Sequence, residues 1–119
     1  YKHFIQRGGG CIMNMNSIRG LESKGQRTIY AASRYANRGF SESFRQEADK
    51  NNVRVMVIYP TRVMTKPEFE YGWPVSEVAD KIYEAYAGGV NDLILDDRPA
   101  QNRPDEYPIR NAEVHFLNP

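Results

Sequence analysis

Three residues, Ser17, Tyr30 and Arg34, have the types and the spacing needed to move a proton to or from a carbonyl or alcohol oxygen. The phenol of a free tyrosine has a pKa near 10, which is too high for efficient acid–base catalysis at neutral pH. Arg34 follows Tyr30 by four residues, so on a helix the two side chains share a face. Opposite unit charges ~5 Å apart attract by roughly 3 kcal/mol at an effective dielectric of about 20, so a cation there favours the tyrosinate. Ser17 would hold the substrate oxygen while Tyr30 exchanges the proton.

Each of these residues also has an ordinary structural interpretation. Tyr30 and Arg34 could be a pair on a helix surface, and Ser17 could cap a helix or a turn. All three together, placed in the order strand, loop and helix, are more specific than any one of them. Open parallel α/β folds bind ligands at the carboxyl ends of their strands, which is where this order would place Ser17.

The first half of the chain predicts the elements that position these residues. The tail of a helix is expected over residues 1–7, a glycine turn over 8–10, and a short apolar strand over 11–16. A polar loop at 20–27 leads to a long helix from Ile29 to about Asp49. In this helix the residues expected to face the core are Ala32, Ala36, Phe40 and Phe44, and those expected to face away are Arg38, Glu42, Arg45 and Asp49.

The second half predicts two more strands and another helix. Residues 53–59 are β-branched and almost entirely apolar, which is typical of a buried strand that Pro60 ends. An amphipathic helix is expected from Val75 to the glycines at 88–89, and a short strand at 93–95. The order strand–helix–strand–helix–strand predicts parallel strands.

Composition limits the class of protein. Of 119 residues, 40% are hydrophobic and 26% are charged, with a formal net charge of +1, as in an ordinary soluble globular domain or part of one. The mixed charges give no support for a nucleic-acid partner, and no apolar run approaches the roughly 20 residues that span a membrane. Cys11 is the only cysteine, and His3 and His115 are far apart. These counts predict a cytoplasmic location and no metal site.

The stretch from residue 10 to residue 47, centred on the Ser17, Tyr30 and Arg34 pattern, resembles the short-chain dehydrogenase/reductase family. The similarity continues at Pro60-Thr61-Arg62-Val63-Met64-Thr65, which stands where the family carries Pro-Gly-x-Val-x-Thr. Residues 90–101 are similar to the branch of NADP-dependent 3-hydroxy-acid dehydrogenases.

The resemblance implies an α/β fold that is the C-terminal part of a Rossmann-like doubly wound parallel sheet, with three strands and two to three helices. Residues 1–101 would form this C-terminal catalytic half, lacking the N-terminal dinucleotide-binding half, and residues 102–119 would be an extended C-terminal tail. The strand at 11–16 would then have an open edge, which invites pairing with another molecule. We therefore expect a homo-oligomer, aggregation, or pairing with a missing N-terminal half.

The resemblance also implies roles for individual residues. Ser17 would polarise the substrate carbonyl, Tyr30 would be the general acid in reduction and the general base in oxidation, and Arg34 would replace a lysine that contacts the nicotinamide ribose. The cofactor, NADP or NAD, would be bound by Asn14, Tyr30, Arg34, Pro60, Val63 and Thr65. A mobile substrate loop would carry Phe69, Tyr71 and Trp73, although these aromatic side chains could equally fold onto the core.

The implied function is an NAD(P)-dependent oxidoreductase that acts on a small alcohol, a carbonyl compound or a 3-hydroxy acid, and that is inactive as the isolated chain. Two departures from the family pattern bear on this: Arg34 cannot copy the compact contact of a lysine, and Thr61 replaces a glycine near the cofactor. They favour the alternative that the chain is a non-catalytic binding or oligomerisation module derived from the same fold. An unrelated parallel α/β binding domain is a third interpretation.

Overall fold

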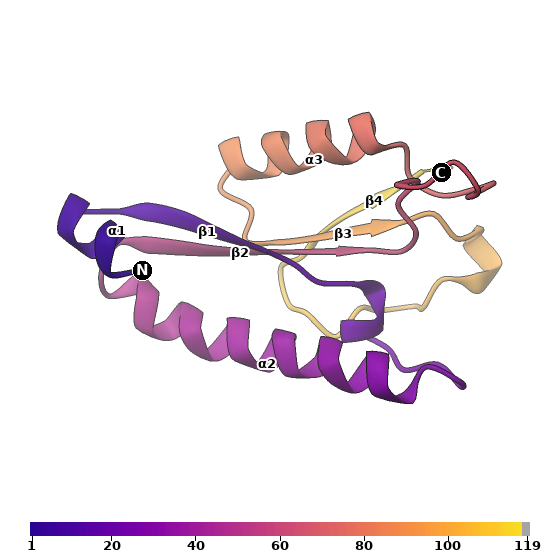
Figure 1. The fold of residues 1–119 in the computed structure, drawn as a ribbon, viewed down its shortest axis with the longest axis horizontal. Helices are drawn as coiled ribbons and strands as arrows, with labels where there is room; N and C mark the ends of the chain where they lie inside the picture. The colour runs from indigo at the N-terminus through magenta and orange to yellow at the C-terminus, as the bar shows by residue number, and fades with distance from the viewer. Residues whose placement is uncertain (118–119) are drawn as a thin grey trace.

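The computed structural model describes residues 1–117, and its centre is a parallel sheet with a helix along each face (Figure 1). Four strands hydrogen-bond in the order β1-β2-β3-β4, and every neighbouring pair is parallel. The strands are β1 (Gly10–Met15), β2 (Val53–Pro60), β3 (Asp92–Asp96) and β4 (Glu113–Phe116). The helices are α1 (Lys2–Arg7), α2 (Thr28–Asp49) and α3 (Val75–Ala87), with short 3-10 turns η1 (Ile18–Gly20) and η2 (Ala100–Asn102). The predicted parallel α/β fold is confirmed.

Strand β2 is the centre of the core, because side chains on both of its faces are covered. Met56 and Ile58 pack on the α3 side, together with Leu93 and Leu95 of β3. Val53 and Val55 pack beneath α2 beside Ala48, and the next residues outward, Val57 and Tyr59, meet Ile18 and Leu21. The almost uninterrupted apolar sequence of β2 is what a parallel strand covered on both faces requires.

The face that α2 turns toward the sheet differs in part from the predicted face: Phe44 packs against the core as expected, but the other predicted core residues do not. Its buried residues are Ala31, Ser41 and Ala48, whereas Ala32 and Ala36 are exposed and Phe40 is 62% exposed. Arg38 and Arg45, which were both expected to face away from the core, instead lie on the side of the helix that faces the sheet. The guanidinium of Arg45 forms a bidentate pair with Asp92 and donates to the Val55 carbonyl, and that of Arg38 donates to the Gly20 and Pro108 carbonyls. The long arginine stems can cover apolar surface once their charged ends are paired, so charge alone misidentified the outer face.

The predicted count of three strands is also corrected, because the segment taken as an extended tail contains β4. This strand pairs with β3 from Leu93↔Glu113 to Asp96↔Phe116. Just before it, Asn111 adopts a left-handed backbone conformation with φ 64°, which an asparagine tolerates and which turns the chain onto the edge of the sheet. Tyr107, Ile109 and Val114 pack against the core on the α2 side. The prolines and asparagines that precede it concealed this short strand, which pairs with β3 and packs Val114 against the core.

All four strands point the same way, so the loops that follow β1, β2 and β3 gather at one edge of the sheet (Figure 1). Helix α2 begins at that same edge, so its first turn lies beside the end of β1. Strand β1 is an edge strand in this chain, with Met13 and Met15 42% and 49% exposed. The open edge expected from the sequence is therefore present.

Candidate active site

Ser17 lies immediately after β1, at the carboxyl edge of the sheet, and its side chain is buried. Its hydroxyl accepts a hydrogen bond from the Arg19 amide at 3.1 Å and so caps η1. The hydroxyl proton is not used by that bond and can be donated to a ligand oxygen. Ser17 is thus both the structural cap that its residue type favours and a donor at the predicted position.

Asn16 holds the backbone around Ser17. Its amide oxygen accepts from the Ser17 N–H at 2.8 Å, and its amide nitrogen donates to the Arg34 carbonyl at 3.1 Å and to the Asn37 side chain at 3.3 Å. Gly20 packs so closely here that an added Cβ would lie 2.7 Å from the Asn16 amide oxygen. These contacts join the end of β1 to the first turns of α2, and they set where Ser17 lies relative to Tyr30.

Tyr30 is in the first turn of α2 and is 46% exposed. The Arg34 guanidinium carbon lies 5.6 Å from the centre of the Tyr30 ring, so the predicted pairing of a tyrosine and a cation on one helix face is present. Arg34 also donates to the Met15 carbonyl and to the Ser33 hydroxyl, each at 3.4 Å. These bonds direct the guanidinium toward the end of β1.

Ser17 and Tyr30 line one cavity of about 520 Å³ at the carboxyl edge of the sheet. The remaining walls come from the loops that follow η1, β2 and β3, and their residues are Ile18, Arg19, Lys24, Arg27, Thr61, Arg62, Val63, Phe69, Tyr71, Asp97 and Arg98. A cavity of this size holds a small molecule. Ser17 and Tyr30, the residues predicted to position the substrate and to transfer the proton, therefore line a shared space.

Comparison with known proteins agrees with this arrangement. The family model described as short chain dehydrogenase matches residues 1–70, which is more than half of the chain. The chain belongs to the short-chain dehydrogenase family.

Curated members of this family share part of the sequence. Carbonyl reductase family member 4 of Xenopus laevis is 41% identical over 64 residues, which are 54% of this chain and 27% of that protein. The human 3-oxoacyl-[acyl-carrier-protein] reductase is 38% identical over 61 residues (51% and 26%), and its mouse counterpart is 30% identical over 93 residues (72% and 39%). The chain thus spans about a quarter to two fifths of the length of these relatives.

Solved structures share the fold. The bulky-bulky ketone specific alcohol dehydrogenase from Comamonas testosteroni superposes with a TM-score of 0.65 at 24% identity, over 78% of this chain and 36% of the other. A putative short-chain dehydrogenase from Novosphingobium aromaticivorans gives a TM-score of 0.66, also at 24% identity, over 77% and 34%.

The structure gathers only some of the residues predicted to bind cofactor or substrate. Val63, Phe69 and Tyr71 line the cavity with Ser17 and Tyr30, whereas Pro60, Thr65 and Arg34 do not. Asn14 is on β1, and its amide donates to the hydroxyl of Ser41 on α2 at 2.9 Å, so its side chain joins strand to helix.

Trp73 does not extend the aromatic pair at the cavity. It is 1% exposed and packs in the core between β2 and α3. For Trp73, therefore, the alternative that the loop aromatics fold onto the core is the one observed, because the indole buries a large apolar area there. Of the three loop aromatics, only Phe69 and Tyr71 face the cavity.

A buried carboxylate, Asp96, organises one wall of the cavity, and sequence reasoning did not find it. Arg98 makes a bidentate pair with Asp96 at 2.9 and 2.7 Å, Tyr107 donates to Asp96 at 2.5 Å, and Arg98 reaches Glu22 at 2.6 Å. Burial alone raises the pKa of the Asp96 carboxyl, but the hydrogen bonds from Arg98 and Tyr107 outweigh burial and hold that pKa below its usual range. The cluster ties the loop after Ser17, the end of β3 and the C-terminal segment together.

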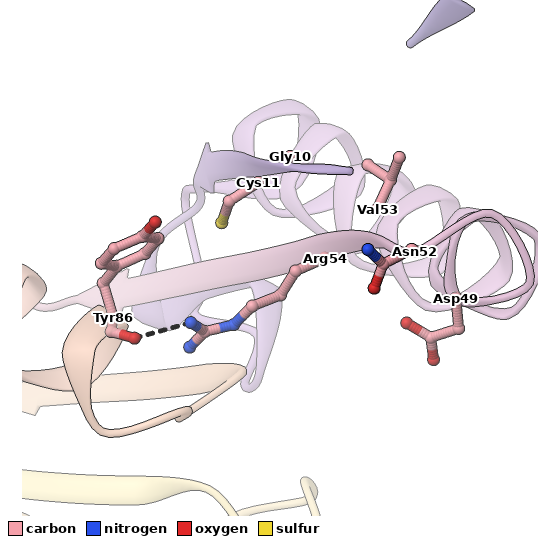
Figure 2. A pocket seen from close by; sticks show the side chains of 7 residues that line it. All are labelled: Gly10, Cys11, Asp49, Asn52, Val53, Arg54 and Tyr86. Carbon is pink, nitrogen blue, oxygen red and sulfur yellow. Dashed lines mark hydrogen bonds between the residues drawn. The ribbon is translucent and has the colours of Figure 1, made fainter. Parts of the chain in front are cut away.

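A second cavity, of about 440 Å³, lies at the opposite edge of the sheet, near the first residues of β1 and β2 (Figure 2). The Arg54 guanidinium in this cavity has a structural role. It donates to the Tyr86 carbonyl at 2.6 Å and to the Val90 carbonyl, and these hydrogen bonds cap the end of α3. Burial raises the pKa of the Cys11 thiol there, while Arg54 partly opposes this effect. A protonated thiol is a weak nucleophile, so this cavity carries no apparent chemistry.

Among residues 1–117, no group of three or more histidine, cysteine, aspartate or glutamate side chains is arranged to hold a metal ion. In the same residues, every helix is too short or too polar to cross a membrane.

Proposed function

We propose that this chain carries the proton-transfer site of an NAD(P)-dependent oxidoreductase that acts on a small alcohol or carbonyl compound, with a 3-hydroxy acid as the preferred kind of substrate. The observation that carries the proposal is that Ser17 and Tyr30 line one cavity at the carboxyl edge of a parallel sheet. The relatives include carbonyl reductase family member 4 and 3-oxoacyl-[acyl-carrier-protein] reductases, and their names support carbonyl reduction as the reaction.

In this proposal, Ser17 donates a hydrogen bond to the substrate carbonyl and fixes its position. Tyr30 gives its proton to that oxygen during reduction and takes it back during oxidation, and Arg34 stabilises the tyrosinate from the same helix face. Asn16 positions Ser17 relative to α2 through its bonds to the Ser17 amide and the Arg34 carbonyl.

The cavity suits the nicotinamide end of NADP or NAD, because Val63 offers it an apolar wall beside Tyr30. When bound, the nicotinamide supplies or accepts the hydride. We assign Pro60, Thr65, Arg34 and Asn14 to its surroundings on family resemblance alone, and we expect turnover to need the dinucleotide-binding half that the family places before this segment. We also propose a cytoplasmic location, on the basis of the single Cys11.

A titration with NADPH tests the cofactor proposal on the chain itself. Trp73 is the only tryptophan, so quenching of its fluorescence and energy transfer to the reduced nicotinamide report binding directly. We expect saturable binding that is weaker than in a whole enzyme. No binding up to millimolar NADPH, the upper end of the usual KM range of about 1 μM–1 mM, would reject a cofactor site in this chain.

Turnover tests the proton-transfer roles once the first half of a family relative is joined to the chain. Tyr30→Phe should abolish turnover and should weaken NADPH binding far less, because the ring stays in place and only the hydroxyl that transfers the proton is removed. Arg34→Lys should raise turnover if the site is a weakened enzyme.

A second candidate, an assembly module that has lost turnover, is favoured by the exposed side of α2. Ile29, Tyr35 and Phe40 are exposed on this helix at 85%, 41% and 62%. Large apolar side chains exposed along one helix can take part in protein–protein contact, so we propose that α2 mediates self-association. No turnover with either Arg34 or Lys at position 34, together with concentration-dependent assembly, would favour the module.

A further inference from the structure

The proposed substrate cavity is far more basic than the chain as a whole. Five of its lining residues are cationic, and Asp97 is its single acidic residue. Across the whole sequence, by contrast, 16 basic residues are balanced by 15 acidic ones. The five cations are Arg19, Lys24, Arg27, Arg62 and Arg98. Positive charge is therefore concentrated at this edge of the sheet.

Most of these cations are not compensated by the protein. Among residues 1–117, Arg98 is the only one of the five with a carboxylate within ion-pair distance, since it contacts Asp96 and Glu22. Arg19, Lys24, Arg27 and Arg62 share a cavity with a single carboxylate, that of Asp97. Clustered like charges repel, and a concave site focuses their field, so an anion is attracted to this space.

Arg62 has the geometry of an anion receptor. Its guanidinium carbon lies 4.9 Å from the centre of the Phe69 ring and 4.6 Å from that of Tyr71, so the two aromatic side chains hold the guanidinium by cation–π contact. Among the described residues, none accepts a hydrogen bond from this guanidinium. Its N–H groups are therefore available to bind a carboxylate or phosphate through two parallel hydrogen bonds.

We infer that the substrate carries a carboxylate or a phosphate in addition to its reacting alcohol or carbonyl, and that Arg62 binds this group while Lys24 and Arg27 add attractive charge. This inference rests on the proposed function, because it assigns the anion to the molecule that Ser17 and Tyr30 act on. Phe69 and Tyr71 then serve to hold Arg62 in place.

The phosphates of the cofactor are the competing source of negative charge. Lys24 and Arg27 lie in the loop that joins Ser17 to Tyr30, and Arg62 is held by Phe69 and Tyr71. The cations thus line the same cavity as the two residues that would contact the reacting oxygen. This placement favours the substrate as the partner of Arg62.

The test measures ligand binding to the isotope-labelled chain by NMR titration. The probes are 3-hydroxybutyrate, its neutral methyl ester and glycerol 3-phosphate, and NADPH is titrated separately. Arg62→Gln removes the guanidinium and its charge, whereas Arg62→Lys keeps the charge but loses the planar group that can donate two parallel hydrogen bonds. Lys50→Gln is the matched control, because it removes one positive charge from an exposed residue at the far end of α2.

We expect 3-hydroxybutyrate or glycerol 3-phosphate to bind at least about ten-fold more tightly than the ester, and the tighter of the two identifies the anion. Arg62→Gln should weaken binding of that anion about ten-fold or more, and Arg62→Lys should weaken it by less. Lys50→Gln should change its binding by less than about two-fold. Equal affinity for acid and ester, or no binding of either anion, would overturn the inference and leave the NADPH result standing. The inference would also be overturned if Arg62→Gln weakened the binding of NADPH but not the binding of the anion. Failure of NADPH to bind while the anion still binds at Arg62 would instead reject the proposed cofactor chemistry.

Discussion

Arg98 should be the most costly single residue to remove from the wall of the proposed active site. Its guanidinium neutralises Asp96, which is 0% exposed, and also reaches Glu22 in the loop after Ser17. Arg98→Met keeps a stem of similar length but leaves the Asp96 carboxylate buried without its cation. Breaking such a buried pair typically costs about 3–5 kcal/mol. Asp96 would still accept from Tyr107 and from the amide of residue 98, so we expect the lower end, about 3 kcal/mol.

Urea unfolding followed by circular dichroism measures this loss. For a chain of this size the dependence of unfolding free energy on urea is about 1–3 kcal/mol per molar, so the midpoint should fall by roughly 1–3 M. Asp96→Asn and the double variant complete a mutant cycle, in which the double variant should be more stable than the sum of the single losses predicts, by about 2 kcal/mol. Glu42→Gln, which breaks the exposed Arg38–Glu42 pair, should cost no more than about 0.5 kcal/mol.

The same reasoning predicts a dependence on pH. The folded pKa of Asp96 is below its usual range, so the pair stabilises the fold above the unfolded value of about 3.9 and this stabilisation is lost as the pH falls through the folded value. The difference in unfolding free energy between wild type and Arg98→Met should therefore become smaller in acid. Two results would refute the reasoning. One is a loss of unfolding free energy for Arg98→Met as small as that for Glu42→Gln, and the other is strict additivity of the Arg98 and Asp96 substitutions in the mutant cycle.

Three further outcomes follow from the buried phenols and from the exposed side of α2. Tyr107→Phe should cost about 1.5–3 kcal/mol in urea unfolding, because its hydroxyl donates to the charged Asp96, whereas Tyr59→Phe should be neutral within about 1 kcal/mol, because its buried hydroxyl has no partner among the described residues. Burial raises the pKa of both Tyr59 and Tyr107. Their contribution to the unfolding free energy should therefore be fully present below the ordinary tyrosine pKa of about 10 and should be lost as the pH rises above it. An unfolding free energy that does not change with alkaline pH would contradict this. Phe40→Ser should weaken self-association in sedimentation measurements while Glu47→Ser, an exposed control on the same helix, should not, and a wild-type chain that stays monomeric at high concentration would contradict the assembly proposal.

The sequence predicts the secondary structure well where hydrophobic pattern and turn residues agree. The long helix expected from Ile29 to about Asp49 is observed at Thr28–Asp49, and the helix expected from Val75 ends at Ala87, before the two glycines. Side-chain environment was predicted less well. Arg45 and Arg38 lie over the sheet because backbone carbonyls and Asp92 satisfy their guanidinium groups, and those partners are remote in sequence. A pattern of charges along one helix does not contain that information.

The same distinction explains which part of the site could be predicted. Ser17 and Tyr30 line one cavity because strand order and helix direction place the end of β1 beside the start of α2, and both follow from local pattern. The cations belong to separate segments, namely η1 with the loop after it, the loop after β2 and the loop after β3, and each of them alone looks like an ordinary surface charge. Only the fold brings them together around a single acidic residue, Asp97. In this chain, therefore, the residues proposed to perform the chemistry are readable from spacing, whereas those proposed to select the substrate emerge only from the tertiary arrangement of the loops.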